Sequence, residues 1–254
     1  MAEVSQLQLV PAGQVAREVA VRESQNGICY AAYGDTLVTD IDLERIVQAV
    51  PPSIAAALKR RAWYFVPLAI GEGEETLVSP GYTTDLGDRA TCHRNVRYAG
   101  SECVFISSRL LQDRFALSFE FFINAGHAFV DETGVPQTFS DLLWKQAVAD
   151  VRGETSHDAW ESRHKAMGHE GSGERNLPAR VDEKAKTAYF ESAFADAVAI
   201  YLLSLTVDFE YADLREREYP LLAPQQLAER LRAVAELFPP NPGYEFAVLY
   251  RKRP

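Results

Sequence analysis

The amino-acid sequence predicts an α+β fold, in which a small mixed sheet packs on a mainly helical body. Aromatic and β-branched segments typical of strands lie between residues 62 and 107, and helical periodicity dominates from residue 108 onward. A doubly wound parallel fold would need strands that recur between the helices, which this order does not supply. With 254 residues and 47% hydrophobic content, the chain is long enough to bury a substantial core.

The first half of the chain carries the predicted strands. Residues 1–40 form an N-terminal segment in which only GICYAAYGD, residues 27–35, indicates a strand. In chain order we then predict a helix at 40–61, a buried strand at 62–70, a loop rich in turn residues at 71–94, and a strand or hairpin arm at 95–107. Pro51 and Pro52 break the helix in its middle, and Pro67 lies near one end of the buried strand.

Helices dominate the second half. We predict them from about residue 108 to 131, from an N-cap at Ser140 or Asp141 onward, from about 184 to 205, and across 222–238. The segment 152–182 is polar and glycine-bearing and holds three of the five histidines, so we expect a loop there that could order on binding or hold a metal. Residues 41–254 are expected to form one domain, continuous with the N-terminal segment.

Composition and charge narrow the classes of partner. The net charge of −10 disfavours nucleic acid, because phosphate binding needs a basic surface. The three cysteines are too few and too scattered for a disulfide framework or a zinc site. The sequence shows neither a basic segment leading into an apolar run nor a long apolar stretch, so we expect a cytoplasmic protein that does not bind membranes. Export by another route and the oligomeric state stay open.

The predicted helix at 108–131 carries an unusual polar stripe. Glu120, Asn124, His127 and Asp131 stand at positions 0, +4, +7 and +11, so they share one helical face, while large apolar residues cover much of the rest. A buried polar stripe needs partners or a cleft. Two interpretations are open at this point: the stripe faces solvent, or it lines a cleft.

Two segments resemble zinc metallopeptidases of the zincin fold. FEFFINAGHAFVD, residues 119–131, resembles the HExxH helix, with Ile123 at the first histidine, Asn124 at the glutamate and His127 at the second histidine. YFESAFADAVAIYL, residues 189–202, resembles the second helix of gluzincins related to anthrax lethal factor. In that register Ser192 takes the place of the ligand glutamate, and Glu191 precedes it. The resemblance covers about residues 43–205 and implies a zincin-like fold.

The departures from the family pattern predict lost metal chemistry. A catalytic zinc needs three protein ligands and a base, whereas Ile123 offers no lone pair and Asn124 no basic group. We therefore expect a pseudoenzyme without a cofactor; zinc held by His127 and Glu191 is the alternative. The resemblance implies a relic cleft formed by Glu120, Ile123, Asn124, His127, Asp131, Glu191, Ser192 and Asp196.

Three functions are compatible with the sequence. The first is a non-catalytic module that binds a peptide or protein in the relic groove, beside an edge strand within 95–107. The second is a divergent hydrolase in which His127 acts with Glu120, Glu191 or Asp196, either with a metal completed by residues of the segment 152–182 or by metal-free acid–base chemistry. The third is a helical interaction protein whose polar stripe meets solvent. A cysteine nucleophile is disfavoured, because Cys92 and its neighbour His93 would point to opposite faces of a strand.

Overall fold

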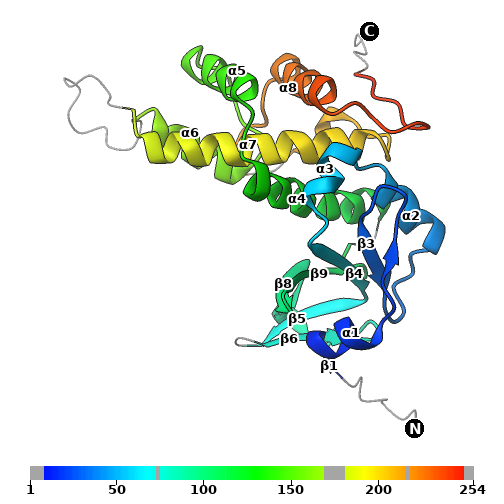
Figure 1. Ribbon diagram of the computed structural model, residues 1–254. Helices are drawn as coiled ribbons and strands as arrows, with labels where there is room; N and C mark the ends of the chain where they lie inside the picture. Colours follow the sequence, from blue (N-terminus) through cyan, green and yellow to red (C-terminus); the bar gives the residue numbers. More distant parts are fainter. Residues whose placement is uncertain (1–8, 73–74, 112, 169–180, 216–217, 249–254) are drawn as a thin grey trace. The chain divides into compact units, whose positions relative to one another are not determined.

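The computed structural model describes residues 9–72, 75–111, 113–168, 181–215 and 218–248. The chain is an α+β protein, as the sequence predicts, and it divides into two compact units, Met1–Phe121 and Phe122–Pro254. The first unit contains the strands of both sheets, and the second is helical (Figure 1). Helix α4, Arg114–Thr133, runs across the boundary between them.

The first unit contains a five-stranded mixed sheet with the order β2-β3-β4-β9-β8. Its strands are Arg22–Glu23 (β2), Cys29–Ala32 (β3), Arg61–Val66 (β4), His93–Tyr98 (β8) and Ser101–Ser107 (β9). Strands β3, β4 and β9 are parallel, whereas β8 and β2 pair antiparallel at the two edges. The sequence-predicted strand at 27–35 is confirmed as β3, and the segment at 95–107 is a hairpin of which the first arm forms the sheet edge.

A second sheet of four strands has the order β1-β6-β5-β7. Its strands are Val10–Pro11 (β1), Leu68–Glu72 (β5), Glu75–Ser79 (β6) and Ala90–Thr91 (β7). The prediction of a loop at 71–94 was wrong, because this segment contains β6, β7, the short 3-10 helix Gly87–Arg89 and the start of β8. The predicted strand at 62–70 is divided at Pro67, which lacks an N–H group, and its halves enter different sheets.

Each face of the five-stranded sheet packs on a different layer. On one face, Tyr64 stacks on Phe105 in a core shared with helix α1, Ala12–Glu18, and with strands β5 and β6. On the other face, Trp63 and Phe65 contact the ring of Phe121 at the start of α4. The sheet is therefore buried on both sides, which explains why its central strands are almost continuously apolar.

The helical segment at 40–61 has the predicted break. Helix α2, Asp40–Gln48, begins after its N-cap Thr39, and helix α3, Pro52–Ala57, starts with proline in its first turn. Leu43, Ile46 and Val47 provide the buried face of α2. Together α2 and α3 connect the parallel strands β3 and β4, as a crossover between parallel strands requires.

The second unit is built around the long helix α7, which Figure 1 shows in yellow with α5, α6 and α8 around it. Its helices are Gln137–Val148 (α5), His157–Ala166 (α6), Glu183–Ser204 (α7) and Pro224–Leu237 (α8), with the 3-10 helix Tyr211–Leu214. Asp182 caps α7 by accepting hydrogen bonds from two backbone amides. Phe194 of α7 contacts Phe129, Phe139 and Phe238 in the core.

Three boundaries differ from the sequence predictions in the helical half. Helix α4 begins at Arg114 rather than 108, where Asp113 accepts a hydrogen bond from the amide of Ala116. Helix α5 begins after Pro136, so Ser140 and Asp141 lie inside it. The segment 152–182, expected as a loop, contains α6 with Ser156 as its N-cap, and its residues 169–180 lie outside the described residues.

Candidate functional site

The polar stripe on α4 is neither uniformly buried nor uniformly exposed. Glu120 and Asn124 are half-buried, as is the apolar Ile123, whereas His127 and Asp131 are exposed. The apolar residues that alternate with them, including Phe121, Phe122 and Phe129, are buried. The N-terminal part of the stripe is therefore partly covered, and its C-terminal part is exposed to solvent. Solvent exposure, one of the two interpretations left open by the sequence, thus applies to only part of the stripe.

Helices α4 and α7 meet at two small residues. A Cβ atom added at Gly126 would lie 2.6 Å from the backbone oxygen of Ala195, which is far inside van der Waals contact. Close approach of two helix backbones requires such small residues at the contact. The contact brings the following residues, His127 and Asp196, into the same region, so the two segments that resemble the zincin motifs are neighbours within the second unit.

Asp196 is the buried acid of this region. Its side chain is 2% exposed and accepts a hydrogen bond of 2.8 Å from Thr155 Oγ1. Burial raises the pKa of Asp196 to about 6, against hydrogen bonds from Ser156 and Thr155 and the nearby charge of His127, which lower it. Three of the residues predicted for the relic cleft, Glu191, Ser192 and Asp196, lie on α7, and of these the structure places Asp196 within electrostatic range of His127.

The other two predicted partners are placed differently. Glu191 is exposed and Ser192 is half-buried on α7, and within the described residues neither makes a polar contact with His127. Glu191 and Ser192 lie one turn before Asp196 on α7. The turn beside Gly126 is the one that contains Ala195 and Asp196.

Glu120 has a partner that the sequence did not reveal. His93, the first residue of the edge strand β8, places its Nδ1 atom 2.6 Å from Oε1 of Glu120. The two residues are 27 positions apart, and only the packing of α4 on the sheet brings them together. Cys92 beside them is a poor nucleophile, because burial and the negative charge of Glu120 raise the pKa of its thiol.

The edge strand β8 offers backbone groups on its outer side. The amide of Ser107 donates to the carbonyl of Cys92. This hydrogen bond, with the antiparallel register, tells which residues of β8 hydrogen-bond to β9: every second residue, counted from Cys92. Asn95 and Arg97 occupy the intervening, non-hydrogen-bonded positions, so their backbone N–H and C=O groups point away from β9. Within the described residues β8 has no other strand partner, so these groups remain available to an added strand.

The described part of the chain has few side chains placed to bind a metal ion. No group of three or more His, Cys, Asp and Glu side chains is arranged there to hold a metal ion. Within the segment 152–182, Glu154 is fully buried and receives hydrogen bonds from Arg163, Tyr189 and Arg230. Glu154 therefore serves a structural charge cluster, and His169 and Glu170 lie outside the described residues.

Comparison with known proteins adds no relative. The sequence matches no model of a known protein family, and none of the curated protein sequences is similar to it. Among the helices described here, none has the length and apolar character needed to cross a membrane.

Proposed function

We propose that this protein is a non-catalytic, zincin-like module that binds an extended peptide along the outer side of strand β8. The observation that carries the proposal is the antiparallel edge strand, whose backbone groups at Asn95 and Arg97 have no partner among the described residues. A peptide that adds to such an edge gains main-chain hydrogen bonds, and its alternate side chains reach whatever flanks the strand.

The surroundings of β8 give this edge a chemical character. The side chains of His93, Asn95 and Arg97 lie on the same face of the sheet, the one that α4 covers, because side chains alternate along a strand. The pair formed by His93 and Glu120 marks one end of this row, and Arg97 is widely exposed at the other. A peptide bound in this position would meet a cation-bearing, polar surface, so we expect acidic or polar side chains at alternate positions.

The non-catalytic part of the proposal rests on the residues of α4 and α7. Ile123 stands where the zincin pattern has its first histidine and Asn124 where it has its base, which removes two of the groups that zinc hydrolysis needs. A metal-free hydrolase would use His127 with a carboxylate. Asp196, whose charge interacts with that of His127, is buried and held by Thr155, so it offers a substrate no accessible oxygen.

Selection from a displayed library of random decapeptides tests the proposal. Binders are resynthesised with a single N-methyl group at each backbone position in turn, and their Kd is measured by calorimetry. Because an added strand pairs through alternate residues, methylation should weaken binding at every second position and leave the intervening positions nearly unchanged.

Variants of Asn95 provide the matched comparison. Asn95→Pro removes an outward N–H group from an edge strand, where proline is tolerated, and should weaken the selected peptides about tenfold or more. Asn95→Thr keeps the N–H group and should bind like the wild type. Failure to select any binder, or a methylation profile without the two-residue period, would refute binding at β8.

A further inference from the structure

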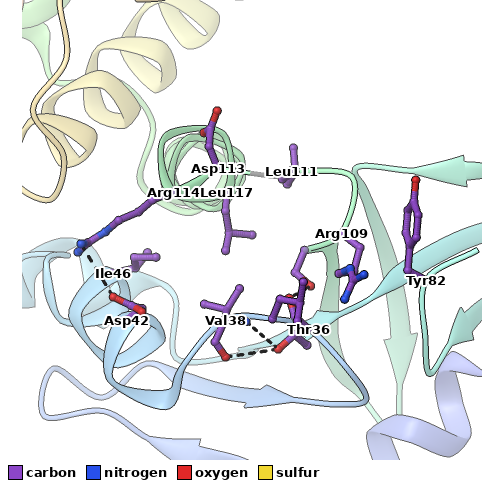
Figure 2. A pocket seen from close by; sticks show the side chains of 12 residues that line it. Thr36, Val38, Asp42, Ile46, Tyr82, Arg109, Leu111, Asp113, Arg114 and Leu117 are labelled. Carbon is purple, nitrogen blue, oxygen red and sulfur yellow. Dashed lines mark hydrogen bonds and ion pairs between the residues drawn. The ribbon is translucent and has the colours of Figure 1, made fainter.

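A second candidate site lies in the first unit at the carboxyl ends of the parallel strands β3 and β9. A cavity of about 430 Å³ lies between the segments that leave these strands and the first turns of α2 and α4, and Figure 2 shows the side chains that line it. Its lining residues are Thr36, Leu37, Val38, Asp42, Ile46, Tyr82, Ser108, Arg109, Leu111, Asp113, Arg114 and Leu117. Cavities of this size, at the carboxyl ends of parallel strands, commonly hold small ligands.

The middle of the cavity is apolar. Val38 and Leu117 lie on opposite sides of it in Figure 2, with Ile46 beside them; Val38 is half-buried, and Ile46 and Leu117 are buried. Large apolar side chains at the rim are exposed to solvent: Leu37 is 74% exposed and Tyr82 is 42% exposed. An apolar cavity with an exposed apolar rim favours a ligand that has an apolar body.

The rim also stores backbone strain. Leu37 has a φ of 57°, a left-handed conformation that a leucine rarely adopts and that is strained. The residue gains no burial from this conformation, because its side chain stays exposed. Strain of this kind persists at sites where a fixed local shape serves binding.

The charged groups of the cavity are not equivalent. Each of its two carboxylates already has a role at the start of a helix: Asp42 accepts a hydrogen bond from the hydroxyl of Thr39, the N-cap of α2, and Asp113 accepts one from the amide of Ala116 in the first turn of α4. The cavity therefore presents no carboxylate that is free of such a role, and its remaining charges are the guanidinium groups of Arg109 and Arg114.

Arg109 is fixed in place with donors to spare. Its Nη1 atom donates to the carboxylate of Asp35 at 3.0 Å, and its guanidinium carbon lies 5.2 Å from the centre of the Tyr82 ring. Within the described residues, its Nε and Nη2 groups have no hydrogen-bond partner. Arg114, at the other end of the cavity in Figure 2, is turned toward Asp42 at 3.9 Å. Arg109 is thus the better prepared anion-binding group.

We propose that this cavity binds a small amphiphilic carboxylate, with the carboxylate on Arg109 and the apolar chain along Val38, Ile46 and Leu117. The planar guanidinium group suits a carboxylate because it can donate two parallel hydrogen bonds. This site uses neither strand β8 nor the residues that resemble zincin motifs, so it stands or falls independently of peptide binding.

A head-group series on the wild-type protein tests the proposal directly. Octanoate, 1-octanol and octylamine share one chain and differ in the head group, and binding is followed by NMR of protein labelled at the methyl groups of Ile, Leu and Val. Octanoate should bind with a Kd below about 1 mM, shift the methyl signals of Val38, Ile46 and Leu117, and bind at least about tenfold more tightly than the other two. Equal binding of all three compounds, or octanoate binding that leaves these methyl groups unshifted, would overturn it.

Two arginine variants then assign the head-group position. Arg109→Gln should weaken octanoate about tenfold or more, whereas Arg114→Gln should change its Kd by less than about threefold. The reverse order would show that the carboxylate does not bind Arg109. The head-group series needs no variant, so it decides the proposal even if Arg109→Gln does not fold.

Discussion

Gly126 is the residue on which the packing of α4 against α7 depends. The Cβ atom of an alanine at this position would lie 2.6 Å from the carbonyl oxygen of Ala195, and helix backbone cannot move aside as a flexible side chain can. We expect Gly126→Ala to lower the free energy of unfolding by about 1–3 kcal/mol, although alanine favours helix by roughly 1 kcal/mol. Urea unfolding followed by circular dichroism measures the change.

Asp131→Ala is the control for this substitution. Asp131 is exposed in the same helix, so its replacement should alter stability by less than about 0.5 kcal/mol. A Gly126→Ala protein more stable than the wild type would mean that α4 and α7 do not approach each other as closely as described.

Asp196 makes a prediction about pH. Its pKa rises from 3.8 to about 6 in the folded protein, so the folded state binds more protons than the unfolded state between roughly pH 4 and 6. Stability from this group is therefore lost as the pH rises through that range, by roughly 2–3 kcal/mol in total. As the pH falls from 7 to 4, the wild type should therefore gain this amount of unfolding free energy relative to Asp196→Asn.

The comparison is made by urea unfolding of both proteins at the two pH values. Asp131→Asn removes an exposed carboxylate from the same unit and should show no such shift. If the difference between wild type and Asp196→Asn were independent of pH, Asp196 would have to keep its ordinary pKa in the folded protein.

At this scale the sequence reveals residue types better than partners. The stripe on α4 can be read from helical spacing, but the pair His93 and Glu120 cannot, because its members belong to a strand and a helix that meet only in the tertiary fold. Thr155 and Ser156 near Asp196 were likewise not predicted, since they precede a short polar helix 40 or so residues upstream.

Among the elements, length and apolar periodicity decided what could be predicted. Helix α7 was placed within a residue or two because its 22 residues carry a long apolar pattern and a capping aspartate. Strand β7 has two residues, too few for any period to show. Helix α6 buries only small residues and Arg163, so its sequence looks like an exposed loop, although Ser156 gives an N-cap signal that could have revealed it.

The edge strand β8 can stabilise the fold and still leave one side for the proposed peptide. Tyr98 and Val96 of β8 pack against the core beneath the sheet, while the opposite face of the strand carries His93, Asn95 and Arg97. The hydrogen bonds that hold β8 to β9 involve the residues between those that point outward. A peptide could therefore join the outer side without disturbing the bonds that hold the strand in place.

For the whole molecule, α4 is the element that both compact units share. Phe121 contacts Trp63 in the first unit, and Phe129 contacts Phe194 in the second. A helix melts cooperatively, so loss of α4 would remove an aromatic side chain from each core at once. We expect the two units to unfold together.

Hydrogen exchange measured by mass spectrometry in increasing urea tests this expectation. Peptides from β4 report on the first unit and peptides from α7 on the second, and their protection should disappear at the same urea concentration. If β4 kept its protection after α7 had lost it, the two units would unfold independently, and α4 would have to lose its helical structure locally between them.

The charge cluster around Glu154 has a consequence for synthesis on the ribosome. Glu154 is completely buried, and its partner Arg230 lies 76 residues further along the chain. At translation rates of roughly 5–20 residues per second, this carboxylate waits about 4–15 s for that guanidinium group. Arg163 and Tyr189 are made earlier but bond only to its Oε1 atom, so Oε2 lacks its partner, and the nascent helical unit would stay loosely packed, until α8 leaves the exit tunnel. During that interval the exposed phenylalanines around α7 would be accessible to chaperones.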